Sequence, residues 1–219
     1  GEVGADHDAS TGQITLSPGE LSKNFSINIY DDTINEPDED AVITLTNPVG
    51  LTLGVQKIHT MTINDNDLPS TVSFENSTYT FNEEDGTVMV RLLIDPPSAF
   101  EITFDLTVAG TAVSPGDHNM TAGQITIPIG EVTYDLSLTI EDDSTDEGAE
   151  TVVLGITNPS PAGIGAVPTT TVTINDNDGP PNVFFNVASS DFAENAVTGT
   201  VEINLDKVSG LDVTVNYTI

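Results

Sequence analysis

The sequence predicts an all-β protein made of tandem immunoglobulin-like antiparallel β-sandwiches, with about seven strands in each repeat of 111 residues. Two observations support this prediction. Apolar and polar side chains alternate in many short runs, which is the pattern of a half-buried strand. The same runs also recur along the chain at a constant spacing. No segment of useful length shows the apolar period of a helix.

The repeat is visible in several short motifs. The tetrapeptide that begins at Gly12 recurs at Gly123, which lies 111 positions later. The hexapeptide Thr-Ile-Asn-Asp-Asn-Asp begins at Thr62 and again at Thr173, at the same spacing. A third, partial copy begins near Val183. Residues 1–67 are therefore expected to be the C-terminal part of one repeat, residues 68–180 a complete repeat, and residues 181–219 the N-terminal part of a further repeat.

Two periods would require 222 residues and the chain has 219, so its end lies about three residues short of returning into phase with its beginning. The preferred explanation is a segment of a longer tandem array. The alternative is a permuted unit whose front part completes the back part of an identical neighbour, head to tail.

The strands of the complete repeat can be assigned in order. Residues 132–140 show the clearest alternation, since every even position is apolar or aromatic and every odd position is polar. The equivalent run in the first copy is 21–29, where Lys23 is the exception. Turns that contain proline, glycine or asparagine separate the remaining expected strands, which are 72–81, 88–94, 102–108, 124–127, 152–156 and 170–174.

Composition excludes several classes of function. Only 4 residues are Lys or Arg against 35 Asp or Glu, and this net charge of -31 argues against binding nucleic acid or an anionic membrane. No apolar run approaches 18 residues, so no direct membrane insertion is expected. Cysteine is absent, which removes disulfides and zinc–thiolate sites. No catalytic constellation is recognisable, and we do not expect an enzyme.

Two acidic loops follow the strand-like runs 21–29 and 132–140. Each contains Asp-Asp, then Glu four residues after the second Asp, then another Glu three residues further on. Carboxylates this dense repel one another if they converge, and a divalent cation with a preference for oxygen ligands would remove that repulsion. Calcium is the expected ion, and a solvated acidic turn is the alternative. Each repeat then ends in Asn-Asp-Asn-Asp, which is either a further part of the cation site or a soluble linker.

These motifs together resemble the Calx-β family. They comprise Gly-x-Ile-Thr, the Gly-Glu turn before the long strand, the Asp-Asp-x-x-x-Glu-x-x-Glu loop, Asn-Pro, and the terminal Thr-Ile-x-Asp-x-Asp. The resemblance covers essentially the whole chain and implies a calcium-binding β-sandwich. The family is found in sodium–calcium exchanger regulatory domains, integrin β4 and large extracellular adhesins.

The resemblance also implies a set of calcium ligands, carried over by matching positions. In the complete repeat they are Glu83, Asp117, Asp142, Asp143, Glu147, Glu150, Asp176 and Asp178, with the carbonyl of Thr145. In the first copy they are Asp6, Asp31, Asp32, Glu36, Glu39, Asp65 and Asp67, with the carbonyl of Ile34, and Glu194 is the corresponding acid of the third copy. Asn66 and Asn177 stand where the fullest family sites have Asp, so one calcium is expected to be weakened or lost.

The function expected from these features is that of an extracellular or cell-surface structural or adhesive module in which calcium stiffens the joints between repeats. The expected partners are neighbouring repeats of the same or an identical chain, and a cell-surface or glycan target. The first alternative is a self-assembling filament subunit. The second is a non-catalytic module of a secreted enzyme.

Overall fold

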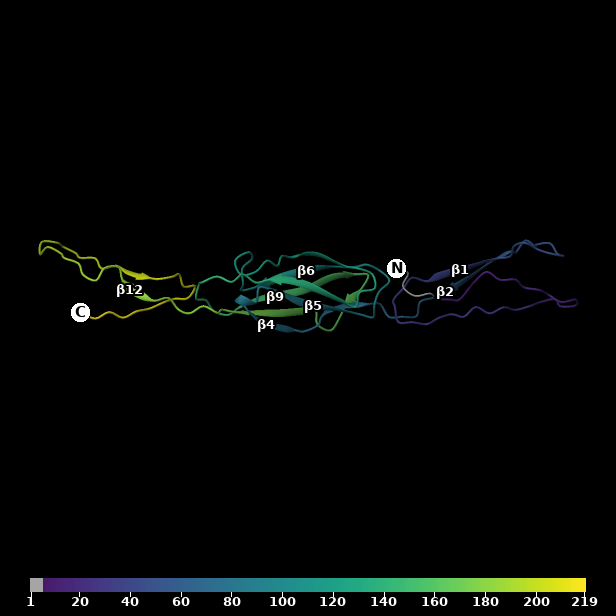
Figure 1. The fold of residues 1–219 in the computed structure, drawn as a ribbon, viewed down its shortest axis with the longest axis horizontal. Helices are drawn as coiled ribbons and strands as arrows, with labels where there is room; N and C mark the ends of the chain where they lie inside the picture. Colours follow the sequence, from purple (N-terminus) through teal and green to yellow (C-terminus); the bar gives the residue numbers. More distant parts are fainter. Residues whose placement is uncertain (1–5) are drawn as a thin grey trace.

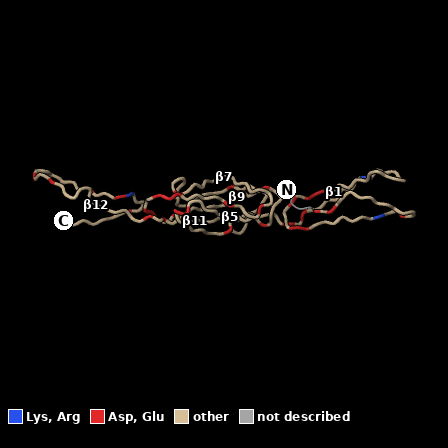
Figure 2. The backbone as a smooth tube through the Cα atoms, viewed as in Figure 1, with Lys and Arg blue, Asp and Glu red and all other residues tan. Residues whose placement is uncertain are grey.

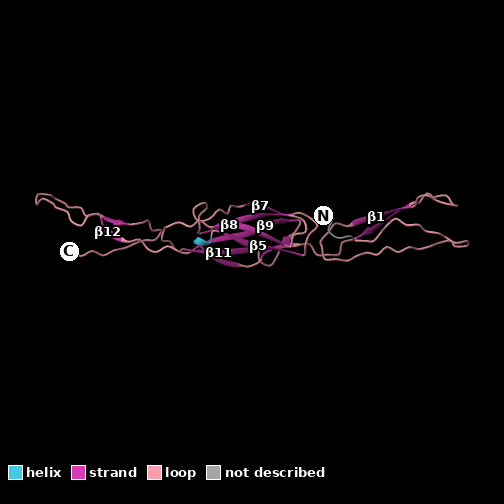
Figure 3. Ribbon diagram, viewed as in Figure 1, coloured by secondary structure: helices cyan, strands magenta, loops and turns pink. Residues whose placement is uncertain are grey.

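The computed structural model describes residues 6–219, which form three parts arranged end to end along one long axis (Figure 1). The first part, residues 6–67, lies at one end. A β-sandwich formed by residues 70–178 lies in the middle, and the third part, residues 181–219, extends from the other side. Strands and loops make up nearly all of the described chain, with one short 3-10 turn (Figure 3). Within it, no helix has the length and apolar character needed to span a membrane.

Two sheets pack face to face in the central sandwich. The order of the first sheet is β10 (Gly163–Ile164), β3 (Thr71–Phe74), β5 (Thr87–Asp95) and β8 (Thr133–Thr139). The order of the second is β4 (Thr78–Asn82), β11 (Thr169–Asn175), β9 (Glu150–Ser160), β6 (Ile102–Gly110) and β7 (Gly123–Ile127).

The alternating side chains of these strands build the core. In β8, Leu136 and Leu138 are buried while Asp135 and Ser137 face solvent, so the predicted alternation of this strand is confirmed. Apolar side chains from both sheets meet between them and are almost completely buried; they include Val72, Phe74, Leu92, Phe104, Leu106, Val152, Leu154 and Val172.

The sandwich has nine strands instead of the seven expected. The short strand β10 was not predicted, and the predicted opening strand 72–81 is divided. The chain crosses from the first sheet to the second at residues 75–77, so that β3 and β4 belong to different sheets. The Glu75 N–H still bonds the Arg91 carbonyl of β5, whereas the Ser77 carbonyl accepts from Thr171 of β11. The antiparallel expectation holds for most pairs, but β4 pairs parallel with β11 and β10 pairs parallel with β3.

The first part contains a hairpin of β1 (Glu39–Thr44) and β2 (Ile58–Ile63), the counterparts of β9 and β11. Its register is conserved, since Glu39 pairs with Ile63 as Glu150 pairs with Ile174. The predicted strand 21–29 is not formed, apart from an isolated bridge between Ile29 and His7. The physical reason is a missing partner: β8 pairs with β5 in the sandwich, and residues 6–67 contain no counterpart of β5.

The third part contains β12 (Val183–Phe185) and β13 (Ile203–Leu205), the counterparts of β3 and β5. Phe185 pairs with Ile203 as Phe74 pairs with Leu92, so the 111-residue spacing holds in this hairpin. The side chains differ in burial, because Phe185 is 58% exposed and Phe74 only 1%. This part reproduces the local pairing of the repeat without its core.

Candidate metal centre

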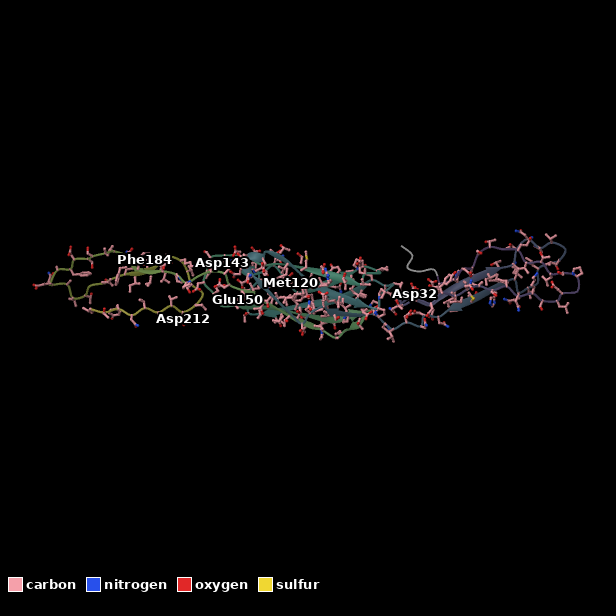
Figure 4. The ribbon with its side chains drawn as sticks, turned by 60° about the horizontal axis from the view of Figure 1, so that its bottom comes forward. Asp32, Met120, Asp143, Glu150, Phe184 and Asp212 are labelled. Atoms are coloured by element: carbon pink, nitrogen blue, oxygen red, sulfur yellow. The ribbon has the colours of Figure 1, made fainter. Side chains whose placement is uncertain are left out.

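The acidic loop that follows β8 lies at the end of the sandwich that faces the third part. Asp143 and Glu150 are seen there in Figure 4, and Asp32 lies at the corresponding joint between the first part and the sandwich. Figure 2 shows that acidic residues gather at both of these joints. The repeat thus places its densest negative charge where one unit meets the next.

One group of carboxylates at this end joins Glu83 to Asp176 and Asp178. Each of the three offers one oxygen, and these oxygens lie within 4.8 Å of one another. Glu83 is 7% exposed and begins the 3-10 turn η1 (Glu83–Asp85), which is fixed by a hydrogen bond from the Asn82 N–H to Asp85. Glu83 Oε2 and Asp178 Oδ2 are buried and have no hydrogen-bond partner.

A second group at the same end joins Asp117, Glu147 and Glu150, again with ligand oxygens within 4.8 Å of one another. Asp117 is positioned by the backbone, since its carbonyl accepts from the Glu141 N–H at 3.0 Å. The next residue, His118, is 2% exposed, and its Nδ1 accepts from the Met120 N–H at 3.0 Å. The histidine therefore supports the base of the loop and lies outside the acidic groups found among residues 6–219.

Backbone N–H groups orient the remaining acids of the loop. Asp143 accepts from the Thr145 N–H at 2.6 Å, and Asp176 accepts from the Glu147 N–H at 2.9 Å. Asp142 accepts instead from the side-chain amide of Asn177 at 3.1 Å. The amide of Asn177 thus stabilises the charge of that carboxylate. The expectation that asparagine at this position weakens one calcium stays a prediction.

The first copy repeats this arrangement. Asp6, Asp32 and Glu36 form a group with ligand oxygens within 4.8 Å of one another. They line a pocket together with Asp31, Asp65 and Asp67. The Ile34 N–H bonds Asp32 at 2.8 Å, the Glu36 N–H bonds Asp65 at 3.3 Å, and the Asn66 amide bonds Asp31 at 3.1 Å. One contact is particular to this copy: Asp38 accepts from the Asp65 N–H at 3.0 Å, where the sandwich has Ala149.

Burial and mutual repulsion disfavour the charged form of these acids. Desolvation, followed by the charges of Asp176 and Asp143, raises the pKa of Glu83 to about 7. Desolvation and neighbouring carboxylates likewise raise the pKa values of Glu36 and Glu150 to about 7. The pKa of Glu147 is raised for the same reasons. Without a cation, these carboxylates are held together against their own electrostatics.

The donor set fits calcium. Every side chain in the three groups is a carboxylate, and calcium takes six to eight oxygen ligands from such side chains and from carbonyls. The two buried, unpartnered carboxylate oxygens of Glu83 and Asp178 supply ligand atoms that nothing else in the described residues satisfies.

The acidic residues predicted to be calcium ligands thus lie at the two joints, with one exception. Asp142, Asp143, Asp31, Asp65, Asp67 and Glu39 lie in the acidic loops and repeat ends around the three groups, and the carbonyls of Thr145 and Ile34 lie in the same loops. Glu194 is different, because it is exposed and no group of acids in the described chain includes it. The ligand assignment itself stays a prediction.

The structure also reveals a contact that the sequence did not suggest. In the loop of the first copy, the Asn35 N–H bonds the Pro97 carbonyl at 3.1 Å, and the Ala99 N–H bonds the Asn35 carbonyl at 3.0 Å. The loop of the sandwich makes the equivalent contact with the third part, where the Gly210 N–H bonds the Asp146 carbonyl at 3.0 Å. Both are parallel bridges, Asn35 to Ser98 and Asp146 to Ser209. Ser98 and Ser209 recur at the 111-residue spacing, and this repetition is the feature of the sequence that could have indicated the contact.

Comparison with known proteins agrees with this geometry. The model of the Calx-beta domain matches residues 1–67 and 65–178. Sodium/calcium exchanger 3 of Rattus norvegicus is 27% identical over 180 residues, covering 72% of this chain and 19% of the exchanger. Sodium/calcium exchanger 1 of Bos taurus is 27% identical over 177 residues, covering 72% of this chain and 18% of the exchanger. The chain thus spans about a fifth of the length of these relatives.

Two solved structures are similar in part. The apo-form Calx CBD1 domain has a TM-score of 0.47 at 23% identity and covers 51% of this chain and 100% of its own. The calcium-binding domain CBD12 of CALX1.1 has a TM-score of 0.45 at 25% identity and covers 49% of this chain and 44% of its own. The family match extends over most of the sequence and falls on the acidic loops described above. The chain therefore belongs to the Calx-beta family of calcium-binding β-sandwich modules.

Proposed function

We propose that this chain is a calcium-binding structural or adhesive segment of an extracellular stalk or surface fibre, in which calcium stiffens the joints between successive repeats. Its partners are the neighbouring repeats and a cell-surface or glycan target. The chemistry requires only that carboxylates bind the ion and hold the loop in one shape.

One observation supports the proposal above all. The residue that contacts the next repeat lies directly between two residues assigned as ligands: Asp146 lies between Thr145 and Glu147. In the first copy, Asn35 lies in the same way between Ile34 and Glu36. An ion that fixes the loop would therefore also fix the backbone pairing across the joint.

The physical consequence is a change in stiffness. Without calcium, repulsion among the carboxylates favours open loop conformations, and few hydrogen bonds are left to hold the orientation: two between backbone groups at the first joint and one at the second. With calcium, the repulsion becomes attraction and the joint has one preferred geometry. A string of repeats then behaves as a rod.

The test uses the whole chain. Because it contains no cysteine, single cysteines introduced at exposed Gln124 and Thr214 carry spin labels that report the distance across the second joint. Calcium is expected to narrow the distance distribution and to raise the melting temperature, and a chelator to reverse both. An unchanged distribution and an unchanged melting temperature in millimolar calcium would reject the proposal.

Exposed apolar side chains support a second candidate function, head-to-tail self-association. Phe25 and Leu16 in the first part are 53% and 44% exposed, whereas their counterparts Leu136 and Ile127 are 5% and 0% exposed. Large apolar side chains of this kind are rarely left in water over a whole segment.

The third part is exposed in the same way. Val215 is 53% exposed where Phe104 of the sandwich is 1% exposed, and Ile203 is 43% exposed where Leu92 is fully buried. Residues 181–219 hold the counterparts of β3, β4, β5 and β6, and residues 6–67 those of β7, β8, β9, β10 and β11. The third part of one copy and the first part of another thus provide complementary halves of one sandwich.

Sedimentation of the 219-residue chain across a range of concentrations tests this second function. Calcium-dependent fibres or dimers support self-association of the chain. A monomer at every concentration, with and without calcium, rejects it and leaves the stalk function unaffected.

A further inference from the structure

The two joints of this chain differ in one charged residue. At the second joint, Lys207 Nζ lies 3.2 Å from Asp178 Oδ1, and the two side chains are 28% and 21% exposed. Lys207 belongs to the third part and Asp178 to the end of the sandwich, so the ion pair spans the joint. It is the only ion pair between a lysine or arginine and a predicted ligand that is found within residues 6–219.

Among the described residues, no lysine or arginine occupies the equivalent position at the first joint. The position equivalent to Lys207 is Pro96, and the acid equivalent to Asp178 is Asp67. Asp67 lines one pocket with Asp31, Asp32 and Asp65. A bound cation would relieve the repulsion among these carboxylates.

Contacts between neighbouring residues of the Lys207 loop and the sandwich fix the position of Lys207 at the joint. Its loop also carries Ser209, whose Oγ lies 3.4 Å from Asp146 Oδ2, and Gly210, whose N–H bonds the Asp146 carbonyl at 3.0 Å. Lys207 thus belongs to the same segment that makes the backbone contact found at both joints. A chain with only 4 basic residues among 219 places one of them against a carboxylate of the calcium site.

Asp178 is the point at which the ammonium group and the calcium site meet. Its Oδ1 accepts from Lys207, its Oδ2 is buried without a partner, and its carboxylate belongs to the group with Glu83 and Asp176. Calcium at this group and the ammonium group therefore draw on the negative charge of one carboxylate, and their like charges disfavour binding of both at once.

We propose that Lys207 acts as an internal counter-ion that competes with calcium for Asp178, so that the second joint is partly ordered without calcium and binds it more weakly than the first. This inference rests on the proposed calcium-binding function and adds a difference between the two joints. The lysine regulates the site and is not itself a ligand of the ion.

The experiment compares the whole chain with its variant Lys207→Gln. Calorimetric titration with calcium is expected to show tighter binding at the second joint, by up to about fivefold, as expected for removal of one partly exposed ion pair. In chelator, spin labels at Gln124 and Thr214 are expected to report a broader distance distribution in Lys207→Gln than in the wild type. Lys207→Arg should retain the wild-type behaviour.

Two control variants make the result specific. Lys57→Gln removes the same charge from an exposed position on the hairpin of the first part and should change neither measurement. Pro96→Lys introduces the cation at the first joint and should weaken calcium binding there. Both readouts unchanged in Lys207→Gln would overturn the inference. If the wild type bound no calcium, the proposed function would fail, while the distance measurement in chelator would still show whether Lys207 orders the joint.

Discussion

Replacing the buried Glu83 by glutamine should stabilise the calcium-free chain. The Glu83 side chain is 7% exposed, its Oε2 has no partner, and its pKa is raised from 4.5 to about 7 by desolvation and nearby carboxylates. A carboxyl group whose pKa is raised in the folded state supports folding below its unfolded pKa and loses that contribution as pH rises through the folded value. The ion-free chain should therefore lose stability between about pH 4.5 and 7.

The size of the effect follows from the shift. Each pKa unit corresponds to about 1.4 kcal/mol, so the full cost of ionising Glu83 approaches about 3 kcal/mol above pH 7. Glu83→Gln removes the charge and keeps the shape. Its free energy of unfolding in chelator at pH 8 should exceed that of the wild type by about 1–3 kcal/mol, and the gain should vanish near pH 4.5.

Calcium should reduce this advantage. If the carboxylate is a ligand, its loss should weaken calcium binding about tenfold or more, which corresponds to about 1.4 kcal/mol of lost stabilisation at saturating calcium. The difference in stability between calcium and chelator should therefore shrink in the variant.

The assay is urea unfolding followed by circular dichroism, at two pH values, with calcium or chelator. Exposed Glu84 in the same 3-10 turn gives a matched control, since Glu84→Gln removes the same charge outside the acidic group and should have little effect. The reasoning is refuted if Glu83→Gln destabilises the chain in chelator at pH 8, or if both variants behave alike.

Three further predictions concern the pH dependence and the packing. The pKa values of Glu36 and Glu150 are also raised to about 7, so calcium binding should release protons, and the affinity for calcium should rise with pH up to about 7 and then level off. Calorimetric titrations in buffers of different ionisation enthalpy measure the proton release. An affinity that does not change with pH contradicts the prediction. Leu138→Ala removes a fully buried side chain and should lower the unfolding free energy by about 2–5 kcal/mol. Met89→Ala, on the exposed face of β5, is the control and should have little effect. An equal decrease in melting temperature for the two variants would count against the assigned core. Gly110→Ala should lower the free energy of unfolding by about 2–4 kcal/mol, because Gly110 has φ +129° and an added Cβ would lie 2.0 Å from the Thr151 carbonyl oxygen. Gly123→Ala is the control, since a Cβ at Gly123 meets no atom within 4 Å. Equal melting temperatures of the two variants would refute the close approach at Gly110.

Alternation in the sequence predicted the strands of the sandwich because both sheets bury one face there. It did not predict the division of 72–81 into β3 and β4, although the sequence carries a sign of it. Residues 75–78 are all polar, and the apolar positions change from even, at Val72 and Phe74, to odd, at Tyr79 and Phe81. It also predicted a strand at 21–29 that does not form. Alternation shows which face of a segment is apolar and does not show whether a strand is available to pair with it.

The acids of the site could be predicted because duplication marks them, and their distribution over several loops follows from the order of the strands. The contact of Asp146 with Ser209 could not be predicted in this way, because it depends on how the following repeat is placed. The same is true of Lys207, whose counterpart Pro96 gives no hint of an ion pair. The serine of the contact with Asp146 does recur at the 111-residue spacing, as Ser98 and Ser209, but a repeated serine alone does not show which residue it contacts.

The equivalence of the two joints has a geometric consequence. Each repeat contacts the next through the same bridge, Asn35 to Ser98 and then Asp146 to Ser209, so each step along the chain applies a similar rotation and a similar advance. Modules related by one such screw operation trace a regular superhelix whose pitch is set by the joint alone. Adding whole modules would lengthen that superhelix without altering its handedness, whereas a change confined to one joint would put a bend at a single place.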